Sequence, residues 1–176
     1  MFKKNDIVVY RGEVCKIVGK QRSDFTGEQC YIMIPFFQQD GSVRHQVPVA
    51  NKGGHLRNLV TKEEIQQLIE STPDIEMLEN KPANMKSQYA ALLKSEDLKD
   101  LICIIKTSFA RNKARLDSNK RIASIDDEYM HRAEKFLFNE ISIVMGMDYD
   151  QAKLYFETEV AKIQNRTGQR PSASAD

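Results

Sequence analysis

Six basic side chains lie close together in the second half of the chain and could contact the phosphates of a nucleic acid. They lie between residues 106 and 121, a segment that contains one acidic residue, Asp117, and so has a net charge of +5. They are Lys106, Arg111, Lys113, Arg115, Lys120 and Arg121. Such side chains bind phosphate oxygens through charge and do not read the base sequence. The segment therefore predicts weak, sequence-independent binding, and its alternative interpretation is a solvated helix end and loop.

The side chains that commonly perform catalysis or bind metals are few and scattered. Cys15, Cys30 and Cys103 form no C-x-x-C pair, which favours buried thiols, and the three histidines share no spacing typical of metal ligands. Asp126 and Asp127 adjoin at a predicted helix start, where carboxylates stabilise the helix dipole. The sequence therefore predicts a protein that is not an enzyme and that uses no metal and no cofactor.

Composition limits the classes of protein to which the chain can belong. Its 176 residues are 41% hydrophobic and 29% charged, with a net charge of +1, so no overall charge attracts it to nucleic acid or membrane. The longest apolar run is Tyr31 to Phe37, which is far shorter than the roughly 20 residues that span a bilayer. No signal peptide is recognisable at the start of the sequence. We expect no membrane contact and a cytoplasmic location.

The first sixty residues predict β-strands, because apolar and polar residues alternate in short runs that turn residues interrupt. Asp40-Gly41 is a strong hairpin signal, since glycine accepts the positive φ that hairpin turns need. The expected strands are Ile7–Tyr10, Val14–Val18, Cys30–Pro35 and Val43–Val47. Four or five such strands predict a small, strongly bent antiparallel barrel.

From Thr61 onward the apolar residues recur with a helical period. Thr61 and Glu64 have the spacing of a capping box, and Pro73 and Pro82 then interrupt the pattern, so we expect a short helix and linker over residues 61–83. Amphipathic helices follow over 84–165 and a disordered tail over 166–176. The first long core stripe is Leu98, Leu101, Ile102, Ile105, Phe109 and Leu116. The sequence predicts an α+β protein of two domains, an antiparallel β-barrel over 1–60 and a helical bundle over 84–165.

Five segments, spread over residues 1 to about 163, resemble the motifs of a known family. Phe2–Tyr10 resembles F-x-x-G-D-x-V-V-Y, Val47-Pro48 resembles V-P, and Leu56–Val60 resembles V-R-x-[VL]-[VIL]. Tyr89–Asp97 resembles a helix that ends in K-L-x-S-G-D, and Ala133–Ile141 resembles A-x-x-x-L-x-x-E-[LI]. In these segments and their order the chain resembles the CarD/CdnL-type bacterial transcription regulators.

The resemblance implies a monomeric adaptor that docks on the β subunit of RNA polymerase. It implies a Tudor-like barrel over residues 1–60, similar to the polymerase interaction domain of the transcription-repair coupling factor. Docking in this family pairs an exposed strand with a strand of the polymerase, and we expect Val43–Val47 to be that strand. The residues expected at the polymerase contact are Arg22, Val43, Arg44, Gln46, Val47 and Pro48. The protein would then be associated with the nucleoid through the polymerase.

The resemblance also implies that the helical domain contacts promoter DNA at the upstream edge of the opened region and modulates open-complex stability. The family places a tryptophan wedge in the minor groove there, but this chain has no tryptophan, and alignment on Tyr89 places Met85 at that position. Met85 is thus either a reduced wedge or a core residue. Together with the basic segment, the expected DNA-binding residues are Met85, Lys86, Lys106, Arg111, Lys113 and Arg115.

The charge distribution favours an alternative in which the adaptor docks on the polymerase and contacts DNA little. Residues 1–60 contain nine basic and five acidic residues, whereas residues 61–176 contain seventeen basic and twenty acidic residues. The helical part is therefore negative outside its basic segment. Activation and repression are both open, because a stabilised open complex helps slow-opening promoters and can hinder escape from others.

Overall fold

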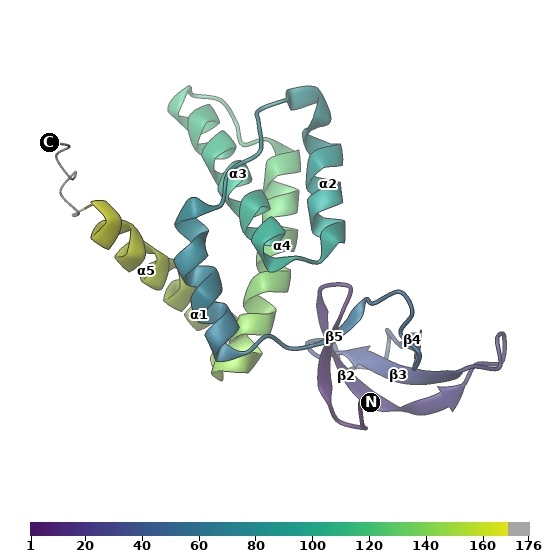
Figure 1. Ribbon diagram of the computed structural model, residues 1–176. Coiled ribbons are helices and arrows are strands. Elements are labelled where there is room, and N and C mark those ends of the chain that lie inside the picture. The colour runs from purple at the N-terminus through teal and green to yellow at the C-terminus, as the bar shows by residue number, and fades with distance from the viewer. Residues whose placement is uncertain (169–176) are drawn as a thin grey trace, which may run out of the picture. The chain divides into compact units, whose positions relative to one another are not determined.

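The computed structural model describes residues 1–168, and contacts within the chain divide it into two compact units, with the division between Val60 and Thr61. Among the described residues, every strand lies in the first unit and every α-helix in the second (Figure 1). This confirms the α+β class, with an antiparallel sheet followed by helices.

The first unit is a five-stranded antiparallel sheet. Its strands are β1 (Ile7–Tyr10), β2 (Glu13–Arg22), β3 (Gln29–Pro35), β4 (His45–Pro48) and β5 (Leu56–Asn58), in the order β4-β3-β2-β1-β5 across the sheet. β1 has the predicted bounds, whereas β2 extends well beyond its predicted end at Val18. The register of β2 against β3 shifts between Ile17 and Gly19, and such an irregularity increases the twist and bend of a strand.

The prediction of a strand over Val43–Val47 is wrong in its start. Gly41 has the expected positive φ of 79°, but the carboxylate of Asp40 accepts hydrogen bonds from both the backbone N–H and the hydroxyl of Ser42. These local bonds satisfy the backbone inside the loop, so the chain joins β3 only at His45. Val43 and Arg44 therefore precede the strand.

The core of the first unit lies on one face of the sheet, which is strongly curved. Its buried residues are Val8, Cys15, Ile17, Tyr31, Met33, Val47 and Leu56. The rings of Tyr10 on β1 and His45 on β4 lie 5.5 Å apart, although β2 and β3 lie between these strands in the sheet. In a flat sheet three strand spacings would separate β1 and β4 by about 14 Å. The sheet therefore bends around its core, but its edge strands β4 and β5 do not pair with each other.

The second unit begins at the predicted capping box. Thr61 Oγ1 accepts a hydrogen bond from the Glu64 backbone N–H at 3.1 Å, and the Glu64 carboxylate accepts one from the Thr61 N–H at 2.7 Å. This cap starts α1 (Lys62–Ser71), which is followed by the single turns η1 (Thr72–Asp74) and η2 (Pro82–Asn84). Both turns contain a proline in their first positions, as its fixed φ allows. The segment expected as a linker thus belongs to the helical unit.

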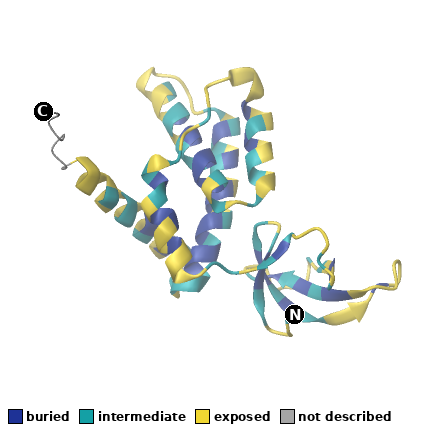
Figure 2. Ribbon diagram, in the orientation of Figure 1, coloured by how far each residue is buried: buried dark blue, intermediate teal, exposed yellow. Residues whose placement is uncertain are grey.

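Four longer helices complete the second unit: α2 (Met85–Ser95), α3 (Leu98–Asp117), α4 (Ser124–Met145) and α5 (Tyr149–Gly168). Buried residues run along α3 and α4, which pack against each other (Figure 2). No helix of residues 1–168 combines the length and the apolar character needed to cross a membrane. The tail expected over residues 166–176 does not begin at residue 166, because residues 166–168 continue α5, and its other residues, 169–176, lie outside the described part of the chain.

The predicted core stripe of α3 is wrong in its second half. Phe109 and Leu116 are 61% and 54% exposed, and the buried face carries Ser108 and Asn112 instead. The Ser108 hydroxyl donates to the Ile104 carbonyl at 2.6 Å, and the Asn112 side chain accepts from the backbone N–H that precedes α4. Polar side chains that are satisfied in this way can be buried, and the hydrophobic pattern does not reveal them.

Candidate protein-docking edge and nucleic-acid interface

β4 is an edge of the sheet, and no strand among residues 1–168 pairs with its outer side. The Val49 N–H donates to the Gln29 carbonyl at 2.9 Å, just beyond the end of β4. Hydrogen-bonded and non-bonded pairs alternate along antiparallel strands, so Val47 and His45 also exchange their bonds with β3. The backbone N–H and C=O of Gln46 therefore point away from the sheet, where they could bond to an added strand.

The structure brings three of the predicted polymerase-contact residues to this edge. Arg44, Gln46 and Pro48 are exposed, because they alternate with residues that face the core. Val47 is one of those core residues, so its side chain packs inside the first unit, and its contact with the polymerase stays a prediction. Pro48 has no N–H, and its carbonyl accepts from Asn51 at 3.0 Å, so the free edge ends there.

Arg22 and Val43 do not join these three residues. Arg22 pairs with Gln29 at the far end of the β2–β3 ladder, level with Val49, whereas Arg44 precedes the opposite end of β4. Arg22 is therefore level with the end of β4, whereas Arg44 lies just before its start. Val43 is only partly exposed and lies before the strand begins.

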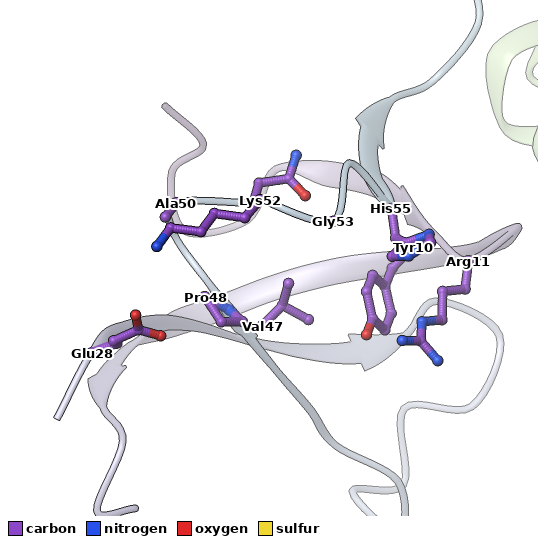
Figure 3. A pocket seen from close by; sticks show the side chains of 10 residues that line it. Tyr10, Arg11, Glu28, Val47, Pro48, Ala50, Lys52, Gly53 and His55 are labelled. Carbon is purple, nitrogen blue, oxygen red and sulfur yellow. The ribbon is translucent and has the colours of Figure 1, made fainter. Parts of the chain in front are cut away.

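A hollow of about 220 Å³ lies beside β4. Tyr10, Arg11 and His55 line one side of it, and Lys52 extends from the loop after β4 (Figure 3). The Arg11 guanidinium lies 5.5 Å from the centre of the Tyr10 ring, and the Arg11 N–H donates to the His55 carbonyl. An aromatic floor with two cations suits an acidic or aromatic side chain of a bound peptide. Sequence reasoning missed this hollow, because it forms between β1 and the loop over residues 50–55.

A second group in the same unit has the chemistry of a metal site. The carboxylate of Glu13, the thiol of Cys15 and the imidazole of His45 each offer a ligand atom, and these atoms all lie within 4.8 Å of one another. Burial raises the pKa of the Cys15 thiol to about 12, and the negative charge of Glu13 adds to this effect. Spacing along the chain could not predict this group, since thirty residues separate Cys15 from His45.

In the helical unit, Met85 is a core residue. Its side chain is 1% exposed at the start of α2. A wedge must reach the base steps, and a buried side chain cannot do so without leaving the core, so this burial favours the interpretation of Met85 as a core residue. The neighbouring Lys86 is exposed.

Arg111 pairs with a buried carboxylate instead of facing solvent. Its Nε donates to both carboxylate oxygens of Asp126, at 3.0 and 3.2 Å, and its NH1 group donates to the side chain of Asn80. The hydroxyl of Tyr89 donates to the same carboxylate at 2.6 Å, and burial together with this bond raises the pKa of Tyr89. Arg111 thus has partners within its own unit, its DNA contact stays a prediction, and Asp126 does more than stabilise the helix dipole.

Lys106 is also engaged within the unit. Its ammonium group donates to the carbonyls of Thr72, Pro73 and Ile75, at 2.9, 3.3 and 2.6 Å. An ammonium group has three protons, and these three bonds use all of them. Lys106 therefore holds the segment after α1 against α3, and its contact with phosphate stays a prediction.

The remaining basic residues gather at the end of α3. Lys113, Lys120 and Arg121 are exposed, and Arg115 donates to the Arg121 carbonyl at 2.8 Å. A hollow of about 300 Å³ lies at this end of α3, and the basic residues that line it are Arg111, Arg115 and Lys120. Cations around a polar hollow can hold a phosphate group, so this end of α3 is the candidate nucleic-acid interface.

No family model and no curated protein matches the sequence of this chain.

Proposed function

We propose that this protein is a non-catalytic transcription regulator of the CarD/CdnL type that docks on the β subunit of RNA polymerase. The curved sheet over residues 1–60 would be the Tudor-like barrel of that family, and the two compact units would be its two domains. The protein would act as a monomer in the cytoplasm, at the nucleoid. The observation that carries the proposal is the free outer edge of β4, with the backbone of Gln46 directed outward.

The turn before β1 supports the resemblance at the level of the backbone. The family motif F-x-x-G-D has a glycine where this chain has Asn5, and Asn5 adopts a positive φ of 74°. Asparagine is one of the few other residues that tolerate this conformation. The Asp6 carboxylate accepts the Lys3 N–H at 2.7 Å, which gives the acidic residue of the motif a structural purpose.

The docking edge is tested by removing the outward N–H of Gln46 while the hydrogen bonds between β4 and β3 are kept. Gln46→Pro removes that N–H, and proline is tolerated on edge strands when the missing N–H faces outward. Gln46→Ala changes the side chain but keeps the N–H, so it is the matched control. We expect Gln46→Pro to weaken capture of the isolated β-subunit lobe at least about tenfold, and Gln46→Ala to have little effect.

Arg44→Glu tests the side chains of the same edge. A reversed charge at an interface that pairs Arg44 with a carboxylate costs on the order of 2 kcal/mol or more, or about thirtyfold in affinity. Lys52→Glu, in the neighbouring loop, tests whether the hollow takes part. Full binding by both Gln46→Pro and Arg44→Glu would show that the polymerase, if it binds, uses another surface.

We further propose that DNA contact is limited to the end of α3. Four basic residues remain for it, Lys113, Arg115, Lys120 and Arg121, because Lys106 and Arg111 are engaged inside the unit. At about −0.9 per neutralised phosphate, the slope of log affinity against log salt can reach only about −3.6. The free protein should therefore bind promoter fragments weakly and without sequence preference.

The internal engagement of Lys106 and Arg111 also favours the second candidate, an adaptor with little DNA contact. A double variant, Lys113→Glu with Lys120→Glu, distinguishes the two. On the first candidate it lowers the affinity of the polymerase–protein complex for promoter DNA and shortens the lifetime of the open complex. Unchanged open-complex lifetimes, with β-lobe binding intact, would favour the second candidate.

A further inference from the structure

The group formed by Glu13, Cys15 and His45 comes from two strands that are not neighbours in the sheet. Glu13 and Cys15 are two residues apart on β2, so their side chains lie on the same face. His45 lies on β4, with β3 between the two strands, and its partner Met33 belongs to the same core face. The curvature of the sheet brings the His45 ring across this face to Glu13, at a distance of 3.4 Å between Nε2 and Oε2.

The Nε2 atom of His45 is the unusual member of this group. It is buried and has no hydrogen-bond partner among the residues that the structure describes. A buried polar atom without a hydrogen bond is unfavourable by roughly 1–3 kcal/mol, so such atoms in folded proteins usually have an explanation. The Nε2 atom faces the Glu13 carboxylate at 3.4 Å without forming a hydrogen bond, and a ligand that binds this nitrogen would satisfy it.

The donor set identifies the class of ligand. A thiolate, an imidazole and a carboxylate are the three side-chain types that bind zinc, whereas calcium and magnesium prefer oxygen alone. Zinc bonds of about 2.0–2.2 Å to nitrogen and oxygen in a tetrahedral site separate these two atoms by roughly 3.4 Å. Nε2 of His45 and Oε2 of Glu13 lie 3.4 Å apart, which matches the separation of two ligands on one zinc ion. Small adjustments of rotamer would bring Sγ of Cys15 to the same centre.

We propose that Glu13, Cys15 and His45 bind one zinc ion, with a water molecule as the fourth ligand. The Cys15 thiol loses its proton to the solvent, and the zinc ion takes the place of that proton on the sulfur. Entry is possible because the side chains of Glu13 and His45 are 40% and 28% exposed at the rim of the core. The proposal does not depend on polymerase docking.

Zinc at this position would tie β4 to β2 across the core face. His45 adjoins Gln46, so the ion would order the strand that forms the free edge. The first unit has only about sixty residues, and units of this size often gain stability from a metal.

The test uses the full chain, freed of metal under reducing conditions. Zinc is titrated by calorimetry, and cobalt(II) is used as a probe because a cobalt–thiolate bond gives a charge-transfer absorption in the near ultraviolet. We expect one equivalent of zinc to bind, cobalt to give the thiolate band, and zinc to displace the cobalt. Because zinc binds the folded state, it should also raise the melting temperature.

Variants identify the ligands. Cys15→Ala should abolish the thiolate band, and His45→Gln and Glu13→Gln should each weaken zinc binding by more than about tenfold. Cys30→Ala changes another buried thiol of the same sheet and should keep both the band and the affinity. Cys15→Ala removes volume from the core, so circular dichroism checks its fold. If this variant unfolds, the variants of the more exposed His45 and Glu13 decide the question.

Absence of the band in the wild-type chain, or a band that survives Cys15→Ala, would overturn the proposal. So would zinc binding that neither His45→Gln nor Glu13→Gln weakens. In those cases His45 and Glu13 form a simple ion pair beside a core cysteine.

Discussion

At the scale of single residues, the helical unit uses charge for its own stability. Asp126 is fully buried, yet it accepts bonds from both Arg111 and Tyr89, so its charge is compensated. A buried ion pair is costly to break, because removal of one partner leaves the other charged and unpaired. The same side chain looks like a simple helix-start carboxylate in the sequence.

Asp126→Asn should therefore destabilise the protein strongly. We expect a loss of about 3 kcal/mol in the free energy of unfolding, since Arg111 is left without its counter-charge, and a smaller loss of about 1.5 kcal/mol for Tyr89→Phe. Urea denaturation measures both. Asp127→Asn, on the half-exposed neighbour, is the control and should change the free energy by less than about 0.5 kcal/mol. Equal effects of Asp126→Asn and Asp127→Asn would contradict the network.

Met85 gives a second prediction at this scale. Met85→Ala leaves a cavity in the core and should lower the free energy of unfolding by about 2 kcal/mol or more, and Met85→Trp should also destabilise by overpacking. Met77→Ala, at a site that is 54% exposed, should have little effect. Thermal melts measure the change. A stable Met85→Trp variant that lengthens the lifetime of the open complex would instead support the wedge interpretation.

At the scale of elements, the segment between α1 and α2 is fastened along α3 by three side chains. Lys106 binds three carbonyls of this segment, the Cys103 thiol donates to the Glu76 carbonyl, and the Thr107 hydroxyl accepts from the Leu78 N–H. The prolines interrupt the helix as expected from the sequence. Contacts from α3 then turn the interrupted stretch into an ordered part of the unit.

Lys106→Met keeps the aliphatic part of the side chain but removes the three hydrogen bonds. We expect a loss of about 2 kcal/mol in the free energy of unfolding and faster hydrogen exchange for amides of residues 72–78, because the carbonyls lose a charged donor. Lys113→Met, on the exposed side of the same helix, is the control. Unchanged exchange in residues 72–78 would show that Cys103 and Thr107 suffice to hold the segment.

At the scale of the whole molecule, the division between Val60 and Thr61 separates two cores. The first is the apolar cluster on the sheet, and the second lies among the helices. The capping box begins α1 directly after the division, so the helical unit carries its own start signal. This arrangement predicts that each unit folds without the other.

Separate expression of residues 1–60 and 61–176 tests this prediction. We expect a dispersed amide spectrum for the first fragment, with a low melting temperature because a unit of this size buries only about 60% of its surface. The second fragment should retain its helical circular dichroism and unfold cooperatively. If polymerase docking is correct, the first fragment should also bind the β-subunit lobe as tightly as the full chain. Fragments that fold only when mixed would contradict independent folding.

What the sequence determined by itself was local. The short apolar run Ile7–Tyr10, the capping box at Thr61 and the positive φ at Gly41 depend on residues close in the chain, and the α+β class follows from such patterns. The start of β4 escaped prediction, because hydrogen bonds of the Asp40 side chain compete with the sheet.

Tertiary structure decided which side chains are free to act. In the sequence, Arg111 and Lys106 look like phosphate ligands. In the structure Arg111 binds Asp126, fifteen residues away, and Lys106 binds carbonyls about thirty residues away. The free edge at Gln46 depends on strand order, and the meeting of Cys15 with His45 depends on the curvature of the sheet. These properties arise from contacts between residues distant in the chain, and local periodicity carries no information about such contacts.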